Sequence, residues 1–377
     1  MGEQLTLADV CSQIIDCEHK TAPAAPRGTE YGYSVGTPCI RNGRLFLDAA
    51  KRVDRATYEK WTARAVPQKN DIILTREAPV GEAALLDGNS RVCLGQRTVL
   101  LRPDSRKINP RFLHYFLLSP AMQERMRTRA EGSTVPHLNV GDIRNLGLGE
   151  LPPLREQHVI AAVLGALDDK IAVNERIATT VDRLAEAEYV RSTGKATETV
   201  LLGDLLDLKY GKALPATSRS PGDVPVYGSG GIVGTHNQHL VDGPGIVVGR
   251  KGTVGAVYWS QQKFFPIDTT FYVEVRRPDV PMEFLFFMLR RLGLDSMNSD
   301  SAVPGLNRAN ALALKTQLPP QDELVRFANK IRPLFELKHS LSVQSNCLKE
   351  LRDTLLPKLI SGELRVRDAE KAVEEAL

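Results

Sequence analysis

The amino-acid sequence predicts an α+β fold in which two similar globular copies alternate with two long helices. The helices are expected to form an antiparallel coiled coil, which makes the chain a pseudo-two-fold tandem repeat. Three observations predict this architecture. Leu-Pro-Pro occurs at residues 151–153 and again at 318–320, a long helical pattern follows each occurrence, and several segments of the first copy recur in the second.

The internal repeat consists of segments that recur in the same order. DIILTREAPVG at 71–81 aligns with GIVVGRKGTVG at 245–255, FLHYFLL at 112–118 with FLFFMLR at 284–290, and STVPHLN at 133–139 with SAVPGLN at 301–307. The offset between the copies falls steadily along the chain, as small deletions in the second copy require. The repeat is longer than the roughly 50 residues of solenoid repeats. It therefore indicates duplication of a whole unit with pseudo-two-fold symmetry.

In each globular copy, short runs rich in Val, Ile and Leu are separated by Gly, Pro, Asn and Asp residues. This pattern predicts a twisted, mostly antiparallel sheet, with FLHYFLL and FLFFMLR as short buried helices. The Gly-rich stretch at 224–240 lacks GxGxxG spacing, and no helical pattern follows it. It predicts tight turns between strands.

Both helical segments carry apolar residues at a spacing of four and three. Such a heptad pattern indicates a coiled-coil seam. The predicted seam residues are Ile160, Leu164, Leu167, Ile171 and Val181 in the first helix, and Leu324, Ile331, Leu334, Leu341, Leu348 and Leu355 in the second. A helix of about 37 residues rises about 55 Å, so the pair is interpreted as a spacer. Two helices of an ordinary bundle core are the alternative.

Proline has two different structural roles in these segments. In Leu-Pro-Pro it is pre-organised for the first turn of a helix and forces the preceding residue into an extended conformation. Pro333 and Pro357 fall inside the second pattern, where proline removes a backbone hydrogen bond. We expect the second helix to bend or restart near these two residues.

Several classes of protein are disfavoured. No GxSxG, HExxH, Walker A, methyltransferase or nuclease motif is present, and His236 and His239 have no further ligand at a useful spacing, so neither catalysis nor a metal is expected. Five cysteines without a CxxC pair indicate reduced thiols. No apolar run reaches the roughly 20 residues of a membrane span and no secretory signal is visible, so a cytoplasmic protein is expected.

Positive charge is concentrated in the globular copies. Residues 1–153 contain 21 Lys and Arg against 17 Asp and Glu, and residues 194–320 contain 13 against 11, whereas 154–193 is acidic. Lys and Arg that neutralise phosphates supply the sequence-independent part of nucleic-acid affinity. The distribution favours a polyanion bound by the two copies, and scattered surface charge is the alternative.

The paired layout resembles the specificity subunit of type I restriction-modification systems. The motifs that carry the resemblance are LPPLREQHVIAAVLGALDDKIAVNERI at 151–177, LPPQDEL at 318–324 and LLPKLISGELRV at 355–366. The resemblance covers essentially the whole chain. The second helix departs from the first at its start, where QDEL replaces LREQ.

The resemblance implies a fold and a function. Residues 1–153 and 194–320 would be two target recognition domains, each reading half of a bipartite, asymmetric double-stranded DNA target. Residues 154–193 and 321–377 would be the spacer and docking helices. The chain itself would be non-catalytic, without a cofactor and without contact to a membrane, in a bacterial or archaeal defence system.

The resemblance also implies partners. Two modification subunits, which bind S-adenosylmethionine and methylate adenine, would dock on the helices. Restriction subunits, which use ATP and magnesium to translocate and cut DNA, would join them.

Side chains that read DNA bases must reach a groove, with Arg or Lys favoured for guanine and Asn or Gln for adenine. The candidates are Arg64, Lys69, Arg76 and Arg97 in the first copy, and His236, Asn237, Arg250, Lys251 and Lys263 in the second. Because Arg76 and Arg250 are equivalent in the repeat, we interpret them as shared phosphate contacts or structural bonds. A solvated surface position is the alternative for each candidate.

A PxLN turn is common to both copies. Its residues are Ser133, Pro136 and Asn139 in the first, and Ser301, Pro304 and Asn307 in the second. A motif shared by both copies cannot distinguish two different half-sites, so a structural turn or a phosphate contact is predicted.

Two other functions stay open from the sequence alone. One is a two-domain protein-interaction adaptor with coiled-coil helices and no DNA specificity. The other is an enzyme that binds a cofactor at the Gly-rich loop 228–234.

Overall fold

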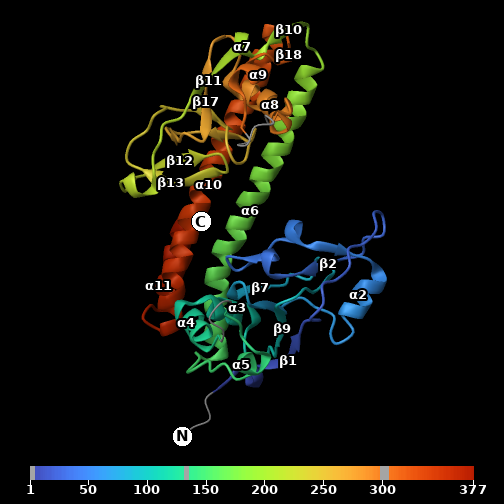
Figure 1. The fold of residues 1–377 in the computed structure, drawn as a ribbon. Coiled ribbons are helices and arrows are strands. Elements are labelled where there is room, and N and C mark those ends of the chain that lie inside the picture. Colours follow the sequence, from blue (N-terminus) through green and yellow to red (C-terminus); the bar gives the residue numbers. More distant parts are fainter. Residues whose placement is uncertain (1–4, 131–135, 298–304) are drawn as a thin grey trace. The chain divides into compact units, whose positions relative to one another are not determined.

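The computed structural model describes residues 5–130, 136–297 and 305–377. The chain divides into two compact units (Figure 1). Unit 1 contains Met1–Ile171 and Asn346–Leu377, and unit 2 contains Ala172–Ser345. The predicted α+β class is confirmed, because each unit combines sheets with helices.

Unit 1 is built around a four-stranded antiparallel sheet. Its spatial order is β1 (Cys11–Asp16), β9 (Thr98–Pro103), β6 (Ile72–Arg76) and β7 (Val80–Leu85). Helix α3 (Pro110–Leu118), the predicted FLHYFLL helix, packs on this sheet with Phe112 buried. Pro110 occupies the first turn of α3 and the Asn109 side chain caps it, which explains where the helix begins.

A second, smaller sheet completes the sheet structure of unit 1. Its order is β5 (Lys51–Val53), β2 (Gly32–Val35) and β8 (Val92–Leu94), with β2 antiparallel to β5 and parallel to β8. Helix α2 (Arg55–Trp61) covers one side of it, with Tyr58 packed among Ala22, Val53 and Cys93. A short hairpin joins β3 (Ile40–Arg41) to β4 (Arg44–Leu45).

Unit 2 repeats both sheets with the same strand order. The larger is β11 (Leu206–Tyr210), β17 (Thr270–Val275), β14 (Gly245–Gly249) and β15 (Val257–Ser260). The smaller is β13 (Gly231–His236), β12 (Val224–Gly228) and β16 (Phe265–Pro266), again with one antiparallel and one parallel neighbour. The predicted FLFFMLR helix is α8 (Met282–Arg291). Unit 2 also has the pair β10 (Glu198–Leu201) and β18 (Lys315–Leu318).

The Gly-rich stretch of the second copy is a β-hairpin. Strand β12 ends at Gly228 and β13 begins at Gly231, and these two residues pair across the turn. Thus the prediction of a tight turn between strands is confirmed.

The remaining helices are short, apart from one at the C-terminus. They are α1 (Leu7–Val10), α4 (Pro120–Arg129), α5 (Val140–Arg144), α7 (Leu202–Leu205), α9 (Arg308–Leu312) and α11 (Val366–Ala376), and the 3₁₀ turns Thr37–Cys39, Leu47–Ala49, Ala216–Ser218 and Leu294–Ser296. Helix α11 packs into the core of unit 1 through Ala369 and Val373. No helix among the described residues is long and apolar enough to cross a membrane.

The two long helices are α6 (Leu154–Thr193) and α10 (Gln321–Ser361), and both continue from one unit into the other. They pack antiparallel. In unit 1 Arg352 pairs with Asp168 at 2.7 Å, and in unit 2 Lys338 pairs with Asp182 at 2.6 Å, so rising numbers on one helix meet falling numbers on the other.

Helix α10 is uninterrupted, so the expectation of a restart at Pro333 or Pro357 is wrong. A proline in a helix interior loses one backbone hydrogen bond and crowds the preceding turn. Ile331 and Phe335 on either side of Pro333, and Leu356 and Leu359 around Pro357, are buried in the cores of their units. This packing holds the helical backbone through both prolines.

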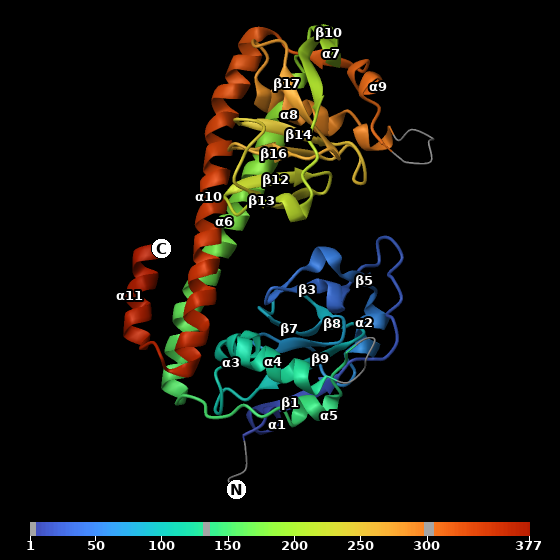
Figure 2. The ribbon, with the colours of Figure 1, turned by 60° about the vertical axis from the view of Figure 1, so that its left-hand side comes forward.

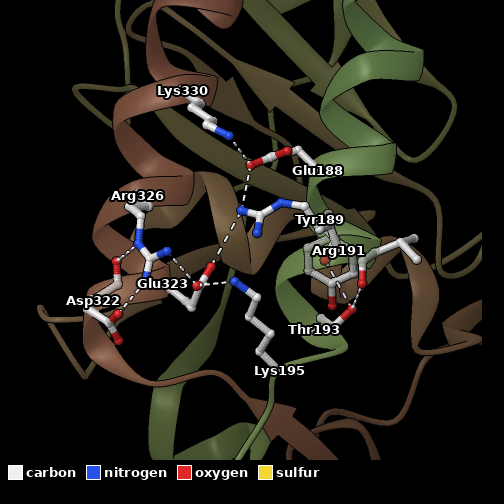
Figure 3. Close-up of polar contacts among 10 residues, drawn as sticks. Glu188, Tyr189, Arg191, Thr193, Lys195, Asp322, Glu323, Arg326 and Lys330 are labelled. Atoms are coloured by element: carbon white, nitrogen blue, oxygen red, sulfur yellow. Dashed lines mark hydrogen bonds and ion pairs between the residues drawn. The ribbon is translucent and has the colours of Figure 1, made fainter.

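Ion pairs join the C-terminal part of α6 to the N-terminal part of α10 in unit 2 (Figure 3). Glu188 accepts from Arg191 at 2.7 Å and from Lys330 at 2.8 Å. These hydrogen bonds, that of Arg191 first, lower the pKa of Glu188 to about 2. The nearly buried Glu323 pairs with Lys195 and Arg191, which puts cations at the C-terminal end of α6 and a carboxylate at the N-terminal end of α10.

Candidate nucleic-acid interface

The PxLN turn contacts the same strand in both units. In unit 1 the N–H of Leu138 donates to the carbonyl of Arg76 at 2.9 Å, and in unit 2 the N–H of Leu306 donates to the carbonyl of Arg250 at 2.9 Å. In unit 1 the turn therefore joins the end of β6 to the segment before α5. In unit 2 it joins the residue that follows β14 to the segment before α9. The repeated sequence motif corresponds to a repeated structural bond.

Each turn ends in an asparagine that precedes a short helix. Asn139 precedes α5, and Asn307 precedes α9, where its side chain accepts the N–H of Asn310 at 3.1 Å. Pro136 is exposed. Ser133, Ser301 and Pro304 lie outside the described residues.

Arg76 is held inside unit 1. Its Nη1 donates to Asp16 Oδ1 at 2.7 Å and its Nε donates to the carbonyl of Leu138 at 3.0 Å. Only 14% of the side chain is exposed. In this position Arg76 supports the turn, and little of its guanidinium is left for a ligand.

Arg250, the equivalent residue of unit 2, is held differently. Its Nη1 donates to the carbonyl of Asp268 at 2.9 Å, and its guanidinium lies 5.0 Å from the ring centre of Tyr210 and 5.9 Å from that of Phe271. Tyr210 is 56% exposed. This site therefore presents an accessible aromatic ring under a cation.

The other candidates of unit 1 are exposed. Arg64 pairs with Glu18 at 2.6 Å, and Arg97 lies 3.4 Å from Glu77. Lys69 has no carboxylate partner among the described residues. Arg64, Lys69 and Arg97 can therefore reach a ligand at the surface.

The candidates of unit 2 divide into exposed and buried residues. Asn237, Lys251 and Lys263 are exposed. His236 is 6% exposed, and its Nδ1 accepts the N–H of Ser220 at 3.0 Å. His236 thus stabilises the end of β13 in this conformation and does not present its ring to a groove.

The predicted seam residues lie within the packed part of each unit. Ile160, Leu164, Leu167, Ile171, Leu348 and Leu355 are buried in unit 1, Val181, Leu324 and Ile331 are buried in unit 2, and Leu334 and Leu341 are partly buried. Asn174, the polar residue of that register, is buried in unit 2. Its Nδ2 donates to Gln344 Oε1 at 2.9 Å and to Ser345 Oγ at 3.2 Å. A polar residue in such a seam specifies the register of the helices.

Sequence reasoning missed a group of aromatic and basic residues on the small sheet of unit 1. They form two separate stacks: the guanidinium of Arg52 lies over the ring of Tyr33, and those of Arg55 and Arg91 lie over the ring of Tyr31. The available signal was the proximity of YGYSV and KRVDR in the sequence. The stack on Tyr31 also needs Arg91, which only the fold brings close to that ring.

The described residues offer no metal site. Within residues 5–130, 136–297 and 305–377, no three His, Cys, Asp or Glu side chains are grouped so as to hold an ion.

Comparison with known proteins identifies the family. A model of the type I restriction modification DNA specificity domain matches residues 7–183 and 195–343. The MjaIX specificity subunit of a type I restriction enzyme from Methanocaldococcus jannaschii is 24% identical over 375 residues, covering 86% of this chain and 84% of that protein. A putative type I specificity subunit from Mycoplasma genitalium is 25% identical over 320 residues, covering 77% of this chain and 81% of that protein.

The fold is also found in a solved structure. The S subunit of a type I restriction-modification system from M. genitalium matches with a TM-score of 0.62 at 19% identity, over 95% of each chain. The family match covers both copies of the repeat and most of the chain. The protein therefore belongs to the family of type I restriction-modification DNA specificity subunits.

Proposed function

We propose that this chain selects the DNA sequence for a type I restriction-modification complex by reading a bipartite, asymmetric target in double-stranded DNA. Residues 1–153 and 194–320 act as the two target recognition domains, one for each half-site. The observation that carries this proposal is that the two units repeat the same sheets in the same strand order, while the residues they expose differ. One framework with two surfaces suits two different half-sites.

Residues 154–193 and 321–377 act as spacer and docking surface. Helices α6 and α10 are uninterrupted over 40 and 41 residues, so the length of each is fixed by the number of residues it contains. The buried hydrogen bonds of Asn174 favour one register of the pair. A spacer of fixed length and register would determine the number of unread base pairs between the half-sites.

The chain works with partners that supply the chemistry. Two modification subunits dock on the helices, bind S-adenosylmethionine and methylate adenine. Restriction subunits bind ATP and magnesium, translocate DNA and cut it. The specificity chain needs no cofactor for this role, because its contribution is the choice of sequence.

Exchange of one recognition domain tests the proposal. Residues 1–153 are replaced by the same domain of a relative, the chimaera is produced with its modification subunit, and methylated adenines are mapped across a genome. We expect one half of the methylated sequence to change and the other half to stay the same. The matched control replaces residues 194–320 and should change the opposite half.

Two outcomes contradict the proposal. If both halves of the site change, or if neither does, the domains are not independent readers. If the complex shows no preference for its methylated duplex, the chain is an adaptor without DNA specificity.

A further inference from the structure

We propose that Arg250 of unit 2 contacts DNA through a free edge of its guanidinium, and that Tyr210 keeps this edge available. Arg76, the equivalent arginine of unit 1, has no such role. This inference rests on the proposed function and names a residue with which the second recognition domain meets its half-site.

The strand register identifies Tyr210 as the counterpart of Asp16. In unit 1, Asp16 on β1 and Leu74 on β6 lie opposite the same residue of β9. In unit 2, Tyr210 on β11 and Val248 on β14 lie opposite the same residue of β17. Because Leu74 and Val248 are aligned in the repeat, Asp16 and Tyr210 occupy equivalent positions in the two sheets.

This difference determines whether the arginine is neutralised. Asp16 accepts from Arg76 at 2.7 Å, so a carboxylate pairs with that guanidinium. Tyr210 offers the face of a ring instead, 5.0 Å from the guanidinium of Arg250. No carboxylate among the described residues pairs with Arg250, since Asp268 contributes only its backbone carbonyl. Stacking on a ring restricts where a guanidinium can point while leaving its N–H groups free to donate.

One edge of the Arg250 guanidinium is free. Its Nη1 donates to the carbonyl of Asp268, whereas its Nε and Nη2 make no hydrogen bond to the described part of the chain. In unit 1 this edge is not free, because Arg76 Nε donates to the carbonyl of Leu138. Two neighbouring N–H donors match O6 and N7 of guanine or two oxygens of a phosphate. Arg250 therefore fits duplex DNA.

The neighbouring charges also favour a polyanion. Lys251 directly follows Arg250, and Lys212 lies two residues after Tyr210. Both lysines are exposed and have no carboxylate partner among the described residues. Backbone hydrogen bonds join both to the segment 266–269, which also binds the Arg250 side chain. Cations of this kind supply the phosphate attraction of a DNA-binding surface.

A partner docked on α10 would not cover this region. The N–H of Leu306 donates to the carbonyl of Arg250 at 2.9 Å, and the segment that contains Leu306 leads into α9. Figure 2 shows α9 on the side of unit 2 away from α10. A modification subunit bound along α10 would leave Arg250 accessible to DNA.

The test is the binding of the complete complex to a duplex that contains the mapped methylation site. The chain with Arg250→Ala or with Tyr210→Asp is assembled with its modification subunits, and affinity is measured by fluorescence anisotropy over a range of salt concentrations. We expect Arg250→Ala to weaken binding about tenfold. Tyr210→Asp keeps Arg250 but gives it the carboxylate partner that Arg76 has, so it should also weaken binding.

The same measurements distinguish a phosphate contact from a guanine contact. If Arg250 binds a phosphate, Arg250→Ala makes the slope of log affinity against log salt shallower by about 0.9 and weakens all duplexes alike. If it binds guanine, the variant discriminates less against duplexes with one base pair replaced in the second half-site. That half-site is the one assigned to residues 194–320 by the domain exchange.

Arg277→Ala is the matched control. Arg277 follows the opposite end of β17, is 33% exposed and pairs with Asp279 at 2.8 Å. Because its charge is already neutralised, this variant should bind within about twofold of the wild type. If Arg250→Ala melts earlier than the wild type, Arg250→Met keeps an unbranched side chain on the ring without the charge and repeats the test.

The outcomes separate this inference from the proposed function. Weaker binding by both variants, with a shallower slope or with reduced discrimination confined to the second half-site, supports Arg250 as a DNA contact. If the wild-type complex is selective and a folded Arg250 variant or Tyr210→Asp binds with unchanged affinity, slope and discrimination, this inference is overturned alone. Reduced discrimination in the first half-site overturns it as well. If the wild-type complex has no preference for its target, the proposed function itself fails.

Discussion

Units 1 and 2 share one framework but differ in what they expose on it. In unit 1 the edge strand β5 exposes Lys51 and Arg52, and the equivalent strand β13 of unit 2 exposes Ile232 and Val233. The strand order and the parallel and antiparallel neighbours are the same in both. Interior positions are constrained by packing and exposed ones are not, so two copies of one fold can acquire different surfaces.

A second difference lies at an equivalent position inside the units. Arg76 pairs with Asp16 and is almost enclosed, whereas Arg250 stacks on the exposed Tyr210. The bond from the PxLN turn to the carbonyl of this arginine is the same in both. The backbone hydrogen bond of this arginine is the same in both units, whereas its side chain makes different contacts in each.

The largest effect is expected from breaking the framework of unit 1 beneath its surface. Asp71 is buried and accepts from Arg102 at 2.9 and 2.7 Å, so Asp71→Ala leaves a partly buried guanidinium without its carboxylate partner, with only its bonds to Gln13 and the carbonyl of Val66. We expect a loss of about 3–5 kcal/mol in the free energy of unfolding. Urea denaturation followed by fluorescence measures it in a Trp259→Phe background, where Trp61 of unit 1 is the remaining tryptophan.

The reciprocal background, Trp61→Phe, shows whether the loss of stability is confined to unit 1. With Trp61→Phe, Trp259 reports on unit 2, and its transition should shift less than that of Trp61. A loss below about 1 kcal/mol at Trp61 would show that the buried pair does not hold the framework of unit 1.

An intermediate effect is expected at the equivalent arginines. Arg76→Ala removes a partly buried ion pair and a hydrogen bond and should cost about 2 kcal/mol, within the range of such losses. Arg250→Ala removes ring stacking and one backbone bond and should cost about 1 kcal/mol. Denaturation curves of both variants check the difference, and equal losses would mean that the two side chains have the same structural role.

The smallest effect is expected on the exposed strand of unit 2. Ile232 and Val233 are 62% and 45% exposed, so their replacement by Thr should change the free energy of unfolding by no more than about 0.5 kcal/mol. Leu208→Ala, in the core of the same unit, is the control and should cost about 2–5 kcal/mol. A large loss in the Thr variant, measured by urea denaturation, would show that β13 belongs to the framework.

Much of the architecture could be predicted because its signals are local. The starts of α6 and α10 follow from Leu-Pro-Pro, the seam from heptad spacing, and the hairpin at 228–231 from its glycines. The exposure of the candidate DNA contacts could be predicted only in part. The sequence indicated Lys69, Asn237, Lys251 and Lys263, which are exposed, but could not reveal that Arg76 and His236 are enclosed.

The sequence by itself determined the repeat, the long helices and the family, because periodicity and motifs depend on neighbouring residues. The tertiary structure decided which distant strands pair and which cations stay exposed. Arg91 reaches Tyr31 because β8 pairs in parallel with β2, and Pro333 is accommodated because buried residues beside it hold α10 in place. Both depend on contacts between residues far apart in the chain, and no local pattern records them.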